Sequence, residues 1–341
     1  MKMRERFHWT AYLIFAAVTV FTLLLSICIG SVRIPMRDTL RIICCAVTGA
    51  PQVESAALPI ILSVRLPRVL CVALSGASLS LSGAAMQGLL KNPLADGSTL
   101  GVSSGASLGA VLAIAFGLTF PGVPFAGTMF MAILFAFLSL LIILTLAYQL
   151  DYSLSTHTII LIGVIYSMFV SSAMNIIAVF AVDKVRDITF WNMGSFQNAS
   201  YQNAVVLALT LVLCGGVLLL QARELNAFAV GEDNARHIGV DVKRTKLIVL
   251  ISVSILIGVC VSVGGTVGFV GLVTPHMVRM LVGPNHRRLL PASAFGGAIF
   301  LLLADLAARV LLDPIELPIG VVTSLVGAVV FLIIFYRTRR R

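Results

Sequence analysis

Residues 66–117 read LPRVLCVALSGASLSLSGAAMQGLLKNPLADGSTLGVSSGASLGAVLAIAFG and carry the clearest structural signal in the chain. Two apolar segments, each about as long as a bilayer-spanning helix, flank a polar break at 91–96. Both segments place small residues four positions apart, on one helix face, where they let two helices approach closely in lipid. These residues are Gly76, Ser80, Ala84 and Gly88 in the first segment, and Gly97, Gly101, Gly105, Gly109, Ala113 and Gly117 in the second. The pattern predicts tightly packed transmembrane helices.

The composition of the whole chain indicates the same class of protein. Hydrophobic residues make up 59% of the 341 residues and charged residues only 11%, whereas a soluble domain carries about 25% charged residues. We therefore expect an all-α, polytopic membrane protein with a single transmembrane domain over residues 1–341. The predicted spans are 10–30, 66–88, 97–117, 126–148, 157–181, 204–221, 246–264, 267–282, 289–312 and 317–336.

The net charge of +10 reflects membrane topology rather than a nucleic-acid-binding surface. Lys and Arg lie in loops and at the termini, where they set the orientation of a membrane protein. No stretch could form the basic face on a soluble module that nucleic acid requires. Ten spans place both basic termini on one side of the membrane. If that side is the cytoplasm, 16 of the 24 Lys and Arg residues lie inside.

No catalytic or metal-binding residue is predicted. The six cysteines show no CxxC spacing. Ser103 lies in a G-x-S-x-G sequence, but that nucleophile motif needs a strand-to-helix turn, or a facing His in an intramembrane serine protease. The best candidate, His276, has no evident orienting carboxylate, so helix packing is the preferred interpretation of this segment. No Walker A motif occurs, so the chain has no site to hydrolyse ATP by itself.

The inner loop 222–246 is the most polar part of the chain and holds 9 of its 38 charged residues. Its segment 231–239, GEDNARHIG, begins with acidic residues and ends with glycine, as a short capped helix does. Such a compact knob suits docking on a cytoplasmic partner, although a solvated connector remains the alternative. The residues expected to carry the contact are Gly231, Glu232, Asp233, Ala235, Arg236 and Gly239.

Two breaks in the apolar pattern, at 91–97 and at 264–276, suggest a transport pathway. Irregular backbone at membrane depth is tolerated only where protein or a watery cavity covers it. Ordinary tight turns at the membrane edge are the alternative for each break alone. The residues predicted to line or gate the pathway are Met86, Gln87, Asn92, Pro93, Ser103, Gly268, Pro275 and His276.

The motifs of this chain together resemble those of the iron-chelate and vitamin B12 uptake permeases of the FecCD class. The matching segments are 65–68, 82–96, 100–105, 231–239, 268–276 and 316–320, which read RLPR, SGAAMQGLLKNPLAD, LGVSSG, GEDNARHIG, GFVGLVTPH and ELPIG. The resemblance runs from about residue 10 to the end of the chain. It is weakest at Thr274, where an aliphatic residue is common, and over 31–60, which has no recognisable pattern.

The resemblance implies a type II ABC importer permease in a bacterial cell membrane, with both termini in the cytoplasm. Its partners would be a second permease subunit of the same or a homologous chain, two ATPase subunits inside, a substrate-binding protein outside, and membrane lipid. ATP and Mg would be used by the ATPase subunits, with no cofactor in this chain. The cargo would be an iron chelate, haem or cobalamin. The alternative is an ion-coupled secondary transporter of a small metabolite, which the near absence of intramembrane carboxylates other than Asp305 disfavours.

Three arginines, Arg65, Arg68 and Arg309, lie at the outer ends of predicted spans, against the positive-inside rule. Arginines at these motif positions in the family meet acidic residues on the two lobes of the binding protein, which implies the same docking role here. Snorkelling to the membrane interface is the alternative explanation for each arginine. Arg309 also follows Asp305 by four positions and could pair with it on one helix face.

Overall fold

The computed structural model describes residues 9–30, 34–49, 57–118, 126–152, 154–313 and 315–339, and the regular structure within these ranges is entirely helical. The elements of the first half are α1 (Trp9–Cys28), α2 (Met36–Thr48), α3 (Ala57–Pro59), η1 (Ile60–Arg65), α4 (Leu66–Leu90), η2 (Gly97–Leu100), α5 (Val102–Ala115), α6 (Ala126–Leu150) and α7 (Thr156–Phe180). Those of the second half are η3 (Val182–Lys184), α8 (Val185–Asn192), α9 (Tyr201–Thr210), η4 (Leu211–Gly215), α10 (Gly216–Leu220), α11 (Ala222–Val230), α12 (Glu232–His237), α13 (Val242–Gly264), α14 (Val270–Val282), α15 (His286–Val310) and α16 (Ile319–Arg339). The all-α fold class is confirmed.

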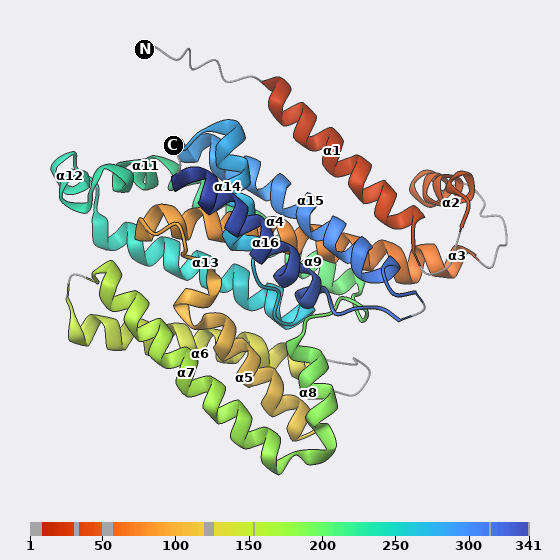
Figure 1. The fold of residues 1–341 in the computed structure, drawn as a ribbon, viewed down its shortest axis with the longest axis horizontal. Coiled ribbons are helices and arrows are strands. Elements are labelled where there is room, and N and C mark those ends of the chain that lie inside the picture. Colours follow the sequence, from red (N-terminus) through yellow and green to blue (C-terminus); the bar gives the residue numbers. More distant parts are fainter. Residues whose placement is uncertain are drawn as a thin grey trace.

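Helices α4 and α13 form the centre of the molecule (Figure 1). Helices α1, α14, α15 and α16 cover one side of this pair, and α5, α6, α7 and α8 cover the other. In the most apolar 18-residue window of each helix, 72% of α13 is buried but only 22% of α1 and of α7. The peripheral helices therefore keep most of their apolar surface for lipid, as expected for a multi-pass membrane protein.

Seven helices in the described part of the chain are long and apolar enough to cross a bilayer, and three shorter apolar helices accompany them. The shorter ones, α5, α14 and part of α16, each adjoin an irregular segment. The short helix α12 and the C-terminal end of α16 lie at one end of the molecule, and α2 lies at the opposite end (Figure 1).

The second span starts earlier than the sequence indicated. A start at residue 66 was expected, but the helix runs without interruption from Ala57 to Leu90, with a π-helical stretch at η1. The apolar residues before Arg65 pack against the core, and Ile61 is fully buried. Because the Arg65 side chain is itself buried, it does not mark the end of the apolar segment.

The small-residue faces pack as predicted. A Cβ added at Gly76 would clash with the carbonyl oxygen of Gly297 in α15, and one added at Gly297 would clash with that of Gly76. Gly83 lies equally close to the backbone of Gly271 in α14. Glycine at these crossings lets backbones touch, which is a main source of helix association in lipid.

Candidate functional site

The two predicted breaks meet around a cavity of about 460 Å³, here called the inner cavity. Its wall comes from η2, the start of α5, α7, the end of α13 and the irregular segment that leads into α14. Gly101 turns η2 into α5 at φ 73°, and Phe269 at φ 66° begins α14. The described residues that line the cavity are Leu79, Leu94, Asp96, Gly97, Ser103, Ser104, Ser107, Met174, Asn192, Ile257, Val261, Thr266, Val267, Gly268, Phe269, Gly271 and Leu272.

The structure brings only part of the predicted pathway set to this cavity. Ser103 and Gly268 line it. Met86 is fully buried in the helix core, so the prediction that it faces a cavity is wrong. The Asn92 side chain accepts a hydrogen bond from the Leu94 backbone N–H (2.9 Å) and closes its own turn.

Gln87 supplies a donor to a carbonyl that the sequence alone shows to lack one. Pro275 lies inside α14 and lacks an N–H, so the carbonyl four residues earlier, on Gly271, has no helical donor. The Gln87 side-chain amide donates to the carbonyls of Gly271 (3.3 Å) and Leu272 (3.2 Å). Its carbonyl oxygen accepts from Arg279 at 2.9 Å. Gln87 and Pro275 thus form a helix–helix junction beside the cavity.

His276 connects the two breaks and is not among the residues that line the inner cavity. Its Nε2 donates to the Pro93 carbonyl at 2.8 Å, and its ring lies edge-on to Phe331 of α16 at 6.2 Å between centroids. The Ser103 hydroxyl donates to the Gly97 carbonyl at 3.4 Å. The described contacts therefore hold Ser103 and His276 in separate backbone junctions, and an intramembrane serine enzyme finds no support in them.

Cysteine substitution tests the position of the cavity wall. In a background without native cysteines, Ser103→Cys should react with a charged, water-soluble thiol reagent, because this side chain lines the inner cavity. Met86→Cys, on the neighbouring helix but without exposed surface, should stay unlabelled over the same time. Labelling by mass shift in membranes measures both. Equal labelling of the two positions would contradict the cavity wall described here.

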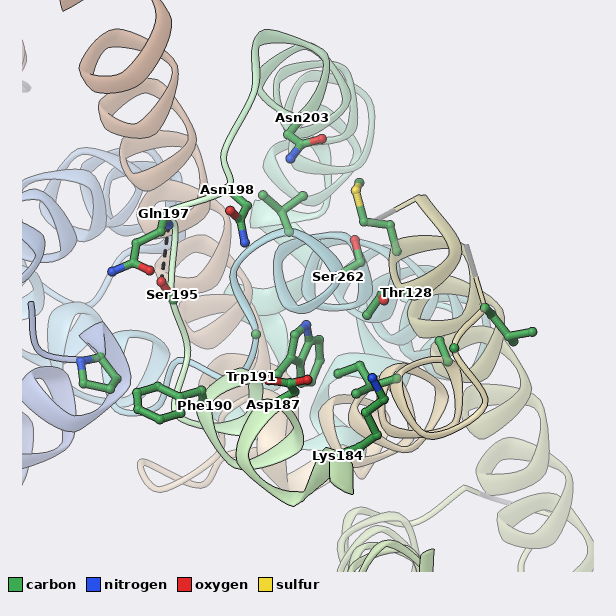
Figure 2. Close-up of a pocket in the computed structure, with 18 of the residues that line it drawn as sticks. Thr128, Lys184, Asp187, Phe190, Trp191, Ser195, Gln197, Asn198, Asn203 and Ser262 are labelled. Carbon is green, nitrogen blue, oxygen red and sulfur yellow. Dashed lines mark hydrogen bonds between the residues drawn. The ribbon is translucent and has the colours of Figure 1, made fainter. Parts of the chain in front are cut away.

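A second cavity of about 580 Å³, here called the outer cavity, lies where α8 and the segment 193–203 meet the ends of α5, α6 and α13 (Figure 2). Trp191 and Phe190 form an aromatic wall, and side-chain amides of Gln197, Asn198 and Asn203 line another part. Trp191 and Phe190 among polar residues suit an interfacial helix, but the sequence patterns do not predict a cavity wall at α8. The aromatic and amide residues that lie between the two apolar spans are the sequence feature that could have indicated this wall.

The three arginines Arg65, Arg68 and Arg309 lie in a buried network. Arg68 contacts Asp305 through Nη2–Oδ1 (2.9 Å) and Glu316 through Nη1–Oε2 (2.8 Å). Arg309 Nε lies 2.9 Å from Asp305 Oδ2. The exposed fractions of Arg65, Arg68 and Arg309 are 6%, 7% and 3%. The expectation of free guanidinium groups at the pathway mouth is thus not met.

Arg65 and Arg309 satisfy the C-terminal end of α1. Arg65 donates to the carbonyls of Ile27 (2.9 Å) and Cys28 (3.1 Å), and Arg309 to those of Ser26 (2.9 Å) and Ile29 (3.0 Å). The last carbonyls of a helix have no intrahelical partner and carry partial negative charge, so cations stabilise them. The sequence pairing of Asp305 with Arg309 is confirmed, but the α1 carbonyls were not foreseeable from local spacing.

Glu316 and Gln197 form the outer rim of this network. The Gln197 amide donates to Glu316 Oε2 at 3.0 Å. Burial would raise the pKa of Glu316, but the hydrogen bond and charge of Arg68 outweigh it and hold that pKa below its usual range. The carboxylate therefore stays charged, and stays paired with Arg68, at neutral and mildly acidic pH.

The knob 231–239 forms a single short helix between two glycines in unusual conformations. Gly231 has φ 138° and Gly239 has φ 89°. Asp233 and Arg236 are exposed, with side chains 90% and 54% accessible, and Ala235 is fully buried. Glu232 points inward, where its Oε2 lies 2.8 Å from Nζ of Lys246. Fewer residues of the knob therefore face outward than the sequence predicted.

Comparison with known proteins identifies a family and several relatives of this chain. The profile of the FecCD transport family matches residues 18–337. An ABC transporter permease protein of Bacillus subtilis, YvrB, is 42% identical over 98% of this chain and 95% of its own length. The hemin transport system permease protein HmuU of Yersinia pestis is 39% identical over 82% and 84%, respectively. Further matches include import permeases named for cobalamin and for molybdate.

A solved structure supports the same assignment. It is an ABC transporter assigned to the metal-chelate type, in an inward-facing conformation, and it superposes with a TM-score of 0.84 at 32% identity over 97% of this chain and all of its own. The chain is a multi-pass membrane protein and belongs to the FecCD transport family.

Proposed function

We propose that the chain is the permease subunit of an ATP-driven importer in a bacterial cell membrane, with an iron chelate, haem or cobalamin as cargo. Two such subunits, identical or homologous, would enclose one pathway. The observation that carries the proposal is the position of the exposed knob, at the end of the molecule opposite α2 (Figure 1). The inner cavity between the two irregular segments accompanies it. The relatives named as hemin and cobalamin permeases support this function.

The knob would dock in a groove of the ATPase subunits, which bind and hydrolyse ATP with Mg. Asp233 and Arg236 offer charges of both signs on one turn, and Ile238 adds an apolar side chain that is 72% exposed. An exposed mixture of apolar and charged side chains is typical of a protein contact rather than a lipid contact. Both chain termini would lie on this cytoplasmic side.

The inner cavity favours a large neutral or chelated cargo over a free oxyanion. Among the described residues that line it none carries a positive charge, and Asp96 is the only ionisable one. Hydroxyl, amide and backbone groups alternate there with apolar side chains. Such a lining gives weak, dispersed contacts, which suit a pathway that a cargo must leave.

On the outer side we expect a substrate-binding protein to dock near the arginine network. The role of Arg65, Arg68 and Arg309 in this docking stays a prediction. Their burial means that Glu316 and Gln197 present the outer rim of the network to a partner. A change of all three arginines to Glu would bury three carboxylates beside Asp305 and disrupt the fold, so single changes at the rim are the better test.

Capture of an ATPase subunit tests the proposal. When the chain is co-expressed with candidate ATPase subunits of the same genome, a tag on the permease should retain one of them. Gly239→Val should abolish this capture or its stimulated ATP hydrolysis, since φ 89° costs a β-branched residue about 1 kcal/mol or more and displaces the knob. Ligand transport that survives ATP depletion but not loss of the membrane potential would favour the secondary carrier instead.

Gly49→Val is the matched control for the Gly239 variant. Gly49 also has positive φ (69°), also ends a short helix, and a Cβ added to it also meets nothing within 4 Å, but it lies after α2 at the opposite end of the molecule. Its variant should capture the ATPase subunit like the wild type. Equal loss in both variants would show a general folding defect and would contradict a specific role of the knob.

A further inference from the structure

The knob 231–239 is joined to the rest of the chain at two glycines. Its glycines, Gly231 and Gly239, have backbone conformations that side chains other than glycine rarely adopt. Between them, Ala235 is fully buried and Glu232 points inward. A force on the exposed side of α12 can therefore reach the membrane helices through the polar contacts of Glu232, in addition to the packing of Ala235 and the chain connections at both ends of the helix.

Glu232 contacts a fully buried cation. Lys246 has no exposed surface, and its Nζ lies 2.8 Å from Glu232 Oε2 and donates to the Leu154 carbonyl at 2.8 Å. A buried ammonium group is stable only when opposite charge and acceptors surround it. Glu232 cannot move away from Lys246 without forcing Lys246, or the Leu154 carbonyl, to move as well.

The Glu232–Lys246 pair also contacts the start of α7. Leu154, which precedes α7, has φ 51° although it is not glycine, and its side chain is 1% exposed. The Thr156 hydroxyl, on the first residue of α7, donates to Glu232 Oε1 at 3.3 Å. The strained residue is held in place by its buried side chain and by Lys246, as is usual for strained backbone at functional positions.

Helix α7 continues from this junction to the inner cavity, where Met174 forms part of the wall. One carboxylate thus joins the first residue of α12, the first turns of α13 and the first residue of α7. We propose that the Glu232–Lys246 pair transmits displacement of the knob to the N-terminus of α7, and through α7 to the inner cavity. Lys246 acts as a positioning residue. The inference rests on the proposed function, because it assumes that an ATPase moves the knob.

The test measures how nucleotide changes the exposure of the cavity wall. Met174→Cys is introduced into a cysteine-free permease, co-purified with its ATPase subunits and reconstituted in liposomes. The rate of labelling by a water-soluble maleimide is measured with and without ATP and Mg. In the otherwise unchanged complex ATP should alter this rate. Lys246→Met keeps the aliphatic stem but removes the charge and the hydrogen-bond donors. It should retain the ATPase subunits yet reduce the ATP effect by about five-fold or more, the smallest usual size of a coupling between sites.

Arg244→Met is the matched control, because Arg244 is an exposed cation two positions away on the same helix and its side chain takes no part in the pair. It should leave the ATP effect unchanged. If Lys246→Met does not insert, Glu232→Gln carries the same test, since it keeps the shape of the side chain but removes its charge. An ATP effect of normal size in the inserted variants would overturn the inference while leaving the proposed function intact. Failure of the unsubstituted chain to retain any ATPase subunit would overturn both.

Discussion

Replacing Asp305 by asparagine should prevent the protein from accumulating in a folded form. Asp305 is fully buried and is the shared partner of Arg68 and Arg309, whose side chains are 9% and 4% exposed. Removing one partner of a buried ion pair leaves an uncompensated charge and costs about 3–5 kcal/mol. Here two guanidinium groups lose their common carboxylate, and Glu316 can neutralise only one of them. The loss is comparable with the whole stability of many proteins, which is about 5–15 kcal/mol.

The yield of monodisperse protein in mild detergent and its thermal midpoint measure this effect. Asp313→Asn is the matched control, because Asp313 lies eight positions later, in the exposed connection between α15 and α16. That variant should behave like the wild type. If Asp305→Asn were as monodisperse and as stable as Asp313→Asn, the network would be a by-product of packing, and free arginines at the outer surface would again be a reasonable interpretation.

The second large loss of stability is expected when one methyl group is added at Gly83. Gly83→Ala would place a Cβ closer to the carbonyl oxygen of Gly271 than the 3.0 Å below which real Cβ contacts are not found. The obstacle is backbone on both sides, so no rotamer change relieves it, and helices α4 and α14 must separate. Overpacking of a core typically costs about 1–3 kcal/mol and occasionally more. The upper part of that range is expected, because the same Gly271 carbonyl also accepts from Gln87.

Gly216→Ala is the control for this prediction. Gly216 begins α10, and a Cβ added there meets nothing within 4 Å. Alanine in a helix is favoured over glycine by about 1 kcal/mol, so this variant should be at least as stable as the wild type. Thermal unfolding of both variants in the same detergent gives the comparison. A Gly83→Ala protein that unfolds at the wild-type temperature would show that α4 and α14 do not touch as described.

Local patterns in the sequence were sufficient for the architecture. The length of the apolar segments predicts membrane helices, because a bilayer core sets that length. The glycine and serine spacing in 76–88 predicts close crossings, and the structure places Gly76 at one of them. Gly83, which lies outside that spacing, is at another. Asp241 accepts a hydrogen bond from the Arg244 backbone N–H at 3.0 Å and caps α13, which begins four residues before the predicted span 246–264. Each of these signals acts within a few residues of its position.

The ion-pair partners of the charged residues could not be predicted from such patterns. Arg68 was interpreted as an outward-facing docking residue, but its partner Asp305 lies 237 positions away. Glu232 was assigned to the outward surface of the knob, but it contacts Lys246, which also bonds a carbonyl 92 positions earlier. A local pattern gives the helix face on which a charge lies, not which distant helix packs there. Burying a charge requires a partner of opposite sign at contact distance, and only the packing of α1, α4 and α15, and of α7, α12 and α13, brings those partners together.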